Sequence, residues 1–137
     1  MKWTVRIVCI LAVVALCAIA FGAYAAEGEE RKWEEYSKDK QGLTFSYDKA
    51  SITYPSPGVI KLWRKRSFPV RASQKEILSL DEIDCYKQKY RSVQLQLVQW
   101  DDTVDTFNKV AEWCVIYGDS PEEYFLDTAC KEVRKKK

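Results

Sequence analysis

The sequence begins with an apolar segment from Ile7 to Ala26 that is preceded by the basic residues Lys2 and Arg6. Basic residues, an apolar centre and a small-x-small site such as Ala23-Tyr24-Ala25 are typical of a secretory signal peptide. We therefore expect export and cleavage after Ala25, which leaves 112 of the 137 residues. That length suits one domain with one core.

Two other interpretations of the N-terminal segment stay open. The apolar run is long enough to span a bilayer, so an uncleaved N-terminal anchor is the alternative to a signal peptide. Lipid attachment at Cys17 is disfavoured, because Leu16 stands where a lipoprotein signal has a small residue. After cleavage we expect a short tether over residues 26–32, one domain over residues 33–137, and no membrane span.

The composition of the mature chain argues against several classes of function. Loss of Lys2 and Arg6 lowers the 22 basic residues to 20, equal to the 20 acidic residues, so the net charge gives no reason to expect nucleic acid as a partner. The chain has no histidine, and Met1 is its one methionine. The usual imidazole ligands and the commonest general base are therefore missing. We expect no metal, no cofactor and no catalysis.

Three cysteines follow the signal segment, at Cys85, Cys114 and Cys130. In an oxidising compartment they allow one intramolecular disulfide and one unpaired thiol. The absence of a C-x-x-C motif argues against a thioredoxin-type redox site and a zinc knuckle.

Alternating apolar and polar residues predict strands in the first half of the domain. A first strand is expected over 33–37, and Leu43, Phe45 and Tyr47 share one face of a second over 43–48. Strands over 51–54 and 59–65 flank Pro55-Ser56-Pro57-Gly58, which predicts a hairpin turn. Residues 70–78 are weakly patterned, which indicates a loop or an irregular edge.

The segment from Asp81 to Arg91 has two interpretations. Its apolar residues fit a helix, but they also fit a backward extension of the strand that contains Val93, Leu95 and Leu97, if a bulge or an edge position absorbs the conflict. A turn at residues 101–102 and a short returning strand over 104–107 are expected next.

The C-terminal segment has the signals of a helix. Ser120 is a suitable N-cap, Pro121 suits the first turn, and Glu123 completes a capping box. We expect one helix over residues 121–134, with Leu126, Cys130 and Val133 on one stripe.

Four local patterns occur in a familiar order. They are Tyr47-Asp48 followed by Ser51-Ile52; Val59 to Leu62 leading into Trp63 and Lys65; Glu82 to Cys85 with Lys89-Tyr90-Arg91; and Trp113 followed by Gly118, Ser120 and Cys130. Together they resemble the surface-adhesin protein E family over residues 33–130.

The resemblance implies an antiparallel sheet with a C-terminal helix, a disulfide between Cys85 and Cys130, and an envelope location. It also implies adhesion to an extracellular or envelope partner as one function. The sequence departs from the family pattern around Cys114 to Asp119, where a proline-containing turn without a cysteine is expected.

Basic residues near the end of one predicted strand form a candidate partner-binding surface. Stacking on aromatic rings and positive charge would together hold an acidic or polyanionic partner. The alternative is a solvated edge strand whose charges prevent unwanted pairing. The residues concerned are Lys61, Trp63, Arg64, Lys65 and Arg66.

Two other groups have ordinary explanations. The apolar neighbours of Cys114 predict a buried, inert thiol, with a covalent homodimer as the alternative. The carboxylates at 101, 102 and 105 and at 122 and 123 lack the spacing of a calcium site and suit a turn and a helix cap.

These observations predict an α+β domain, mostly antiparallel sheet, that is exported to the periplasm or cell surface. Its expected role is non-catalytic binding of a protein or polyanionic partner of the envelope or the extracellular space. The competing hypothesis is a structural or assembly component of the envelope, tethered by an uncleaved N-terminus.

Overall fold

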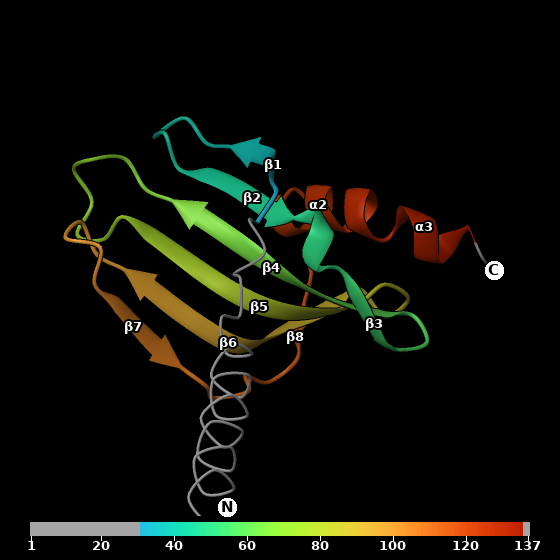
Figure 1. The fold of residues 1–137 in the computed structure, drawn as a ribbon. Helices are drawn as coiled ribbons and strands as arrows, with labels where there is room; N and C mark the ends of the chain where they lie inside the picture. Colours follow the sequence, from blue (N-terminus) through green and yellow to red (C-terminus); the bar gives the residue numbers. More distant parts are fainter. Residues whose placement is uncertain (1–30, 136–137) are drawn as a thin grey trace, which may run out of the picture. The chain divides into compact units, whose positions relative to one another are not determined.

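The computed structural model describes residues 31–135, which form an antiparallel sheet with a helical segment packed on one face (Figure 1). The predicted α+β class, with mostly antiparallel sheet and a C-terminal helix, is confirmed. The predicted signal peptide, its cleavage site and most of the tether lie outside the described residues.

The sheet has the strand order β1-β2-β4-β5-β6-β7, with β3 beside β4 and β8 beside β6, and every pair is antiparallel. Figure 1 shows α2 and α3 beside β1 to β4, whereas β7 lies at the opposite edge. The strands are β1 (Trp33–Lys38), β2 (Thr44–Asp48), β3 (Thr53–Ser56), β4 (Val59–Ser67), β5 (Glu76–Asp84), β6 (Lys89–Val98), β7 (Val104–Phe107) and β8 (Cys114–Val115).

Strand β4 is internal, so the alternative interpretation of it as an edge strand is wrong. Its N-terminal half pairs with β3, its C-terminal half pairs with β2, and β5 runs along its other side. The hairpin before it also differs from the prediction, because Pro55 lies within β3 and only Pro57 and Gly58 turn the chain. Proline is tolerated there because β3 is an edge strand.

Gly58 is required at this turn for two reasons. Its φ is +77°, a conformation that other residues rarely adopt, and an added Cβ would lie 2.3 Å from the ring of Tyr86.

Three expectations for the middle of the chain were wrong. Residues 76–78 begin the central strand β5, although their sequence indicated a loop or an irregular edge. Residues 81–84 continue β5 and residues 89–91 begin β6, so the helical interpretation of the segment also fails. The alternative of one continuous strand across this segment is also wrong, because residues 85–88 form a turn between β5 and β6, and only residues 89–91 extend the strand of Val93 backwards. The register of β5 against β6 shifts between Leu80 and Asp81. The short strand predicted over 104–107 is confirmed as β7.

The C-terminal helical segment is divided at Cys130 into α2 (Pro121–Ala129) and α3 (Lys131–Arg134), where one helix was predicted. The predicted cap is present, since the Ser120 hydroxyl accepts a hydrogen bond from the Glu123 amide at 3.2 Å. The Glu123 carboxylate in turn accepts one from the Asp119 amide at 2.7 Å, which ties the preceding loop to the first turn of α2.

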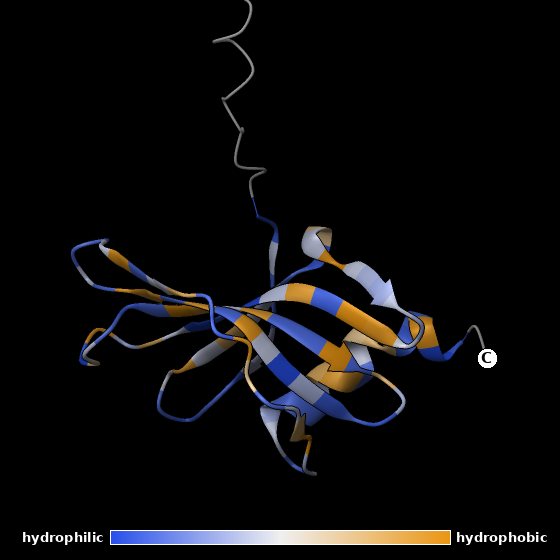
Figure 2. Cartoon of the chain, turned by 90° about the horizontal axis from the view of Figure 1, so that it is seen from below, coloured by the Kyte–Doolittle hydropathy of each residue, from blue (hydrophilic) through white to orange (hydrophobic). Residues whose placement is uncertain are grey.

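The hydrophobic core lies between α2 and the sheet face that α2 covers. Figure 2 shows hydrophobic and hydrophilic residues alternating along the central strands, and β4 accordingly directs Ile60 and Leu62 to this core from one of its two sides. Phe125 of α2 is fully buried, with ring centroids 4.7 Å from Tyr36 and 5.2 Å from Tyr47. The other core residues are Ile60, Leu62, Ile83, Cys85, Ile116, Leu126, Cys130 and Val133.

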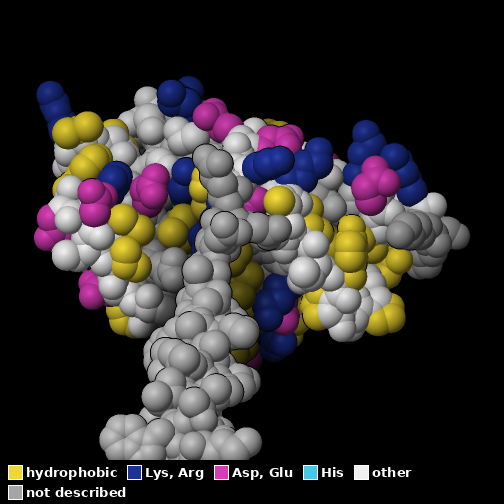
Figure 3. Space-filling view, viewed as in Figure 1, with side chains coloured by type: hydrophobic (Ala, Val, Ile, Leu, Met, Phe, Trp, Pro, Cys, Tyr) yellow, Lys and Arg dark blue, Asp and Glu magenta, His cyan; other side chains and the backbone are white. Residues whose placement is uncertain are grey.

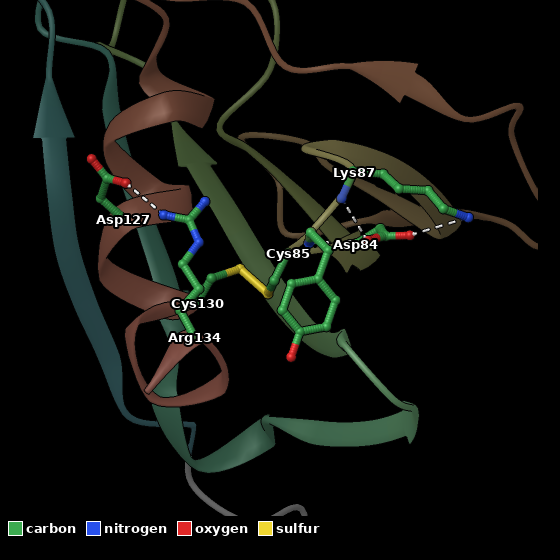
Figure 4. The surroundings of a disulfide bond; sticks show 7 residues. Asp84, Cys85, Lys87, Asp127, Cys130 and Arg134 are labelled. Atoms are coloured by element: carbon green, nitrogen blue, oxygen red, sulfur yellow. Dashed lines mark hydrogen bonds and ion pairs between the residues drawn. A yellow bond between two sulfur atoms is a disulfide. The ribbon is translucent and has the colours of Figure 1, made fainter. Parts of the chain in front are cut away.

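The disulfide implied by the family resemblance is confirmed. Cys85, just after β5, is bonded to Cys130 at the end of α2, and the two Cα atoms are 5.6 Å apart (Figure 4). Both side chains are buried within the core, so the bond links the helical segment to the sheet from inside.

We expect Cys85→Ser and Cys130→Ser each to lower the free energy of unfolding by about 2 to 5 kcal/mol, the usual effect of losing a native disulfide in a small domain. Cys114→Ser is the matched control, because its side chain is exposed and unpaired and its loss should change stability by less than about 0.5 kcal/mol. Urea unfolding of the three variants measures the difference. Equal stability of all three variants would contradict a structural role for the bond.

Candidate functional site

The predicted basic cluster is divided between the two faces of β4. Leu62, Arg64 and Arg66 point to the face that α2 covers, here called the helix face. Lys61, Trp63 and Lys65 alternate with them and point to the opposite side, here called the outer face. Side chains alternate between the two faces of a strand, so the five predicted residues between Lys61 and Arg66 cannot form one surface, and the structure does not bring this cluster together.

Arg64 is buried in an ion pair at the centre of the sheet. Its Nε atom donates to Oδ2 of Asp81 at 2.5 Å, and both side chains are shielded from solvent. The hydroxyl of Ser79 donates to the same carboxylate oxygen at 2.9 Å, and the hydroxyl of Ser92 donates to Oδ1 at 2.6 Å. The carboxylate therefore has three donors from three neighbouring strands.

Aromatic rings from α2 and β6 lie beside Arg64. The guanidinium of Arg64 is 5.4 Å from the ring centroid of Phe125 in α2 and 5.2 Å from that of Tyr90 in β6. Nη1 lies 3.8 Å from the carboxylate of Glu122 in the first turn of α2. Burial disfavours the charged guanidinium, but Asp81, Tyr36 and Glu122 together outweigh this effect and raise the pKa of Arg64 above its usual value.

Arg64 is therefore a structural residue, and its 4% exposed area leaves no surface for a partner. Its inclusion in the predicted partner-binding surface is wrong. Arg66 is half-buried on the same helix face, away from the remaining three residues.

We expect Asp81→Asn to lower the free energy of unfolding by about 3 to 5 kcal/mol, because it leaves a buried guanidinium without a counter-charge. Asp102→Asn is the matched control, since Asp102 binds Lys75 at 2.6 Å but is 75% exposed. An exposed pair of that kind is screened by solvent and contributes little to stability. Chemical denaturation compares the two variants, and a similar small effect in both would contradict a buried charge network.

Tyr36 packs beside this network, and burial raises the pKa of its phenol above 10.0. Burial also raises the pKa values of Tyr47 and Tyr90. At a pH below the pKa of an unfolded tyrosine, both the folded and the unfolded chain hold the proton. Above it, the unfolded chain releases the proton first, so the stability that these phenols contribute is lost as pH rises.

Stability should accordingly decline as the pH rises above about 10, the pKa of tyrosine in an unfolded chain. Tyr36→Phe should make this decline shallower, because one proton linked to folding is removed. Tyr124→Phe, at a position that is 60% exposed, serves as the control. Urea unfolding at a series of alkaline pH values gives the slopes, and identical slopes for the wild type and Tyr36→Phe would contradict the assignment.

The outer face carries a cluster of aromatic rings and cations, here called the tryptophan–cation cluster: Arg31, Trp33, Lys61, Trp63 and Lys65. The guanidinium of Arg31 lies 4.2 Å from the ring centroid of Trp63, and Nζ of Lys65 lies 4.6 Å from that of Trp33. Trp63 is held at its backbone, where its amide donates to the hydroxyl of Ser51 at 2.9 Å.

The cations of this cluster are only partly neutralised. Among residues 31–135, neither Arg31 nor Lys61 forms an ion pair, and the carboxylate of Glu76 is 3.8 Å from Lys65. Glu82 is the cross-strand neighbour of Lys61, but it binds Arg91 at 2.7 Å. Positive charge therefore remains beside two half-buried indole rings, an arrangement suited to an anionic group.

Sequence reasoning missed Arg31, which it assigned to the tether. A possible signal is the spacing from Arg31 to Trp33, since residues two apart in an extended chain point the same way. Figure 3 shows basic, acidic and hydrophobic side chains mixed over the face that it presents, so no single kind of side chain covers that face.

A concave region lies at the tip of the β3–β4 hairpin. It has a volume of about 540 Å³ and is lined by the hairpin, by Tyr86 and by Glu132 and Val133 of α3. Glu132 already binds Lys135 at 3.1 Å, and the hairpin lines the region with Tyr54, two prolines and a glycine. These groups give little basis for choosing a ligand.

The unpaired thiol is exposed, so the prediction that Cys114 is buried is wrong. It lies in β8, a two-residue strand at the sheet margin, and Val115 next to it is 47% exposed. The apolar neighbours predicted burial, but nothing in the described part of the chain packs over this strand.

The described residues contain no group of three or more carboxylates and cysteines placed to hold a metal ion. Within the same range, no helix is long and apolar enough to cross a bilayer.

Comparisons with protein-family models, with curated proteins and with solved structures each found no match.

Proposed function

We propose that this protein is an exported, non-catalytic binding module that uses the outer face of its sheet to capture an acidic or polyanionic partner of the envelope or the extracellular space. The observation that carries the proposal is the tryptophan–cation cluster, in which two indole rings hold cations at the surface without neutralising them. Sulfate, phosphate and carboxylate groups are the natural ligands of such cations.

Two further features support this role. The Cys85–Cys130 disulfide is of a kind that persists in oxidising compartments, which agrees with export. The helix face holds the packing and the buried ion pair, so substitutions on the outer face can change binding without removing the core. Adhesion, as in the surface-adhesin protein E family that the sequence resembles, would be one use of such a surface.

The competing role, a structural or assembly component of the envelope, has one observation in its favour. The edge of the sheet along β7 is exposed and carries large apolar side chains. Pairing through that edge is compatible with a binding function of the outer face.

To test the proposal, Arg31, Lys61 and Lys65 are changed together to glutamate, and retention on a sulfated polysaccharide column is measured against salt. We expect the variant to elute at clearly lower salt, because the cluster would repel sulfate groups, and we expect binding to weaken as salt screens the charges. The fold should remain intact because none of the three side chains belongs to the hydrophobic core, and circular dichroism of the variant checks this.

The control variant changes Lys40, Lys87 and Lys135 to glutamate, which alters net charge equally at other exposed positions. If the two variants lose retention to the same extent, net charge rather than the cluster explains binding. Capture of partners from envelope fractions by the wild type but not by the cluster variant would extend the result to natural ligands.

A further inference from the structure

The exposed edge of the sheet along β7 carries a self-complementary sequence. Residues 104–110 read Val-Asp-Thr-Phe-Asn-Lys-Val. Counted outward from Phe107, residues at equal distances match in chemistry: Thr106 with Asn108, Asp105 with Lys109, and Val104 with Val110. A strand with this pattern complements a second copy of itself when the two run antiparallel.

This edge is free in the described part of the chain. Strand β7 ends the strand order and pairs only with β6. Val104 and Phe107 are each 51% exposed, and Val110 is 53% exposed. An edge strand with large exposed apolar side chains and unpaired backbone groups is a template for pairing with another strand.

The segment continues along the sheet beyond the end of β7. The side chain of Asn108 accepts a hydrogen bond from Nε2 of Gln94 in β6 at 2.8 Å. The amide of Ala111 donates to the carbonyl of Ser92, also in β6, at 2.8 Å. The backbone from Val104 to Ala111 therefore follows one margin of β6.

The charges of the segment have no partner within residues 31–135. Neither Asp105 nor Lys109 forms an ion pair there, although Asp102, three residues before Asp105, binds Lys75. In an antiparallel pair centred on Phe107, each Asp105 would oppose the partner's Lys109, so the dimer would contain two such pairs. Opposite charges at directly opposed positions stabilise a sheet, and like charges destabilise it.

The faces of the sheet also agree with this pairing. Within one chain, Phe107 lies opposite Leu95 of β6 and Asp105 lies opposite Leu97. Asp105, Phe107 and Lys109 therefore share the helix face with these two half-buried leucines. A two-fold axis through Phe107 and perpendicular to the sheet keeps opposed residues on one face. The two Phe107 rings would then cover each other and extend the apolar strip that the leucines begin.

We propose that two copies of this chain associate through residues 104–110, pairing antiparallel about Phe107 to form one sheet across the dimer. The second copy is the chosen occupant because the sequence complements itself in charge and in side-chain size. The segment is short, so the dimer is weak and forms reversibly with concentration.

Sedimentation of the protein expressed from its full coding sequence and processed by the cell tests the proposal. The wild type should show a dimer that increases with concentration. Asp105→Lys and Lys109→Asp should each weaken dimerisation about tenfold or more, because each places two like-charged pairs at the interface. The double variant Asp105→Lys with Lys109→Asp should restore it.

Cross-linking gives a second measurement. In a Cys114→Ser background, Phe107→Cys should form a covalent dimer on mild oxidation, because the two positions meet at the axis. Val115→Cys in the same background is the control, since that position is similarly exposed but lies far from the axis.

Several results would overturn the proposal. They are a monomer at all concentrations up to about 1 mM, single charge reversals without effect, a double variant weaker than either single variant, or equal cross-linking at positions 107 and 115. A wild-type dimer that disappears with reductant and in Cys114→Ser would show that Cys114 joins the copies instead.

Discussion

The positions of several elements in this domain depend on the buried ion pair between Arg64 and Asp81. A guanidinium and a carboxylate at the centre of a sheet are stable only if donors and a counter-charge surround them. Here the donors come from Ser79 and Ser92 on neighbouring strands, and aromatic rings from β6 and α2 enclose the guanidinium. The enclosure requires α2 to pack over Arg64. The disulfide between Cys85 and Cys130, at the C-terminal end of α2, fixes the helix to the same face of the sheet.

The pair also separates the two faces of β4 by role. Arg64 on the helix face is used for folding, while its neighbours Trp63 and Lys65 point to the outer face beside Arg31 and Trp33. A basic segment that looks uniform in the sequence thus contains one structural arginine and two residues of the proposed binding surface. The free edge along β7 is a third region, distant from α2 in the strand order, and it provides the proposed contact between copies.

Local chemistry allowed much of the fold to be predicted. The helix cap formed by Ser120 and Glu123, the existence of strand β2 and a glycine turn at Gly58 depend on neighbouring residues only, and the structure contains each of them. The sequence pattern did not show that β2 is buried on both faces or that Pro55 belongs to β3. Strand β5 escaped prediction because Ser79 and Asp81 occupy buried positions where a strand pattern calls for apolar residues. Their burial depends on Arg64, which lies 17 residues before Asp81 and is invisible to any local pattern.

Only part of the candidate site was predicted, because contacts between residues far apart in the sequence also determine which of its side chains are exposed. Alternation alone could have divided the five residues from Lys61 to Arg66 between two faces, but it could not show which face α2 covers. Cys114 was predicted to be buried because its neighbours are apolar, yet it lies at a sheet margin where the described chain provides no cover. Packing between segments far apart in the sequence thus determines both which basic residues are exposed and why Cys114 is exposed.

We expect the outer face to bind the partner and the helix face to support the fold. An NMR titration with a sulfated oligosaccharide, followed through the indole N–H signals of the tryptophans, distinguishes these two roles. The signals of Trp33 and Trp63 should shift, whereas that of Trp100, whose indole donates to the carbonyl of Ala72 at 2.9 Å, should not. Shifts confined to Trp100 and Trp113, or to residues of α2, would contradict it.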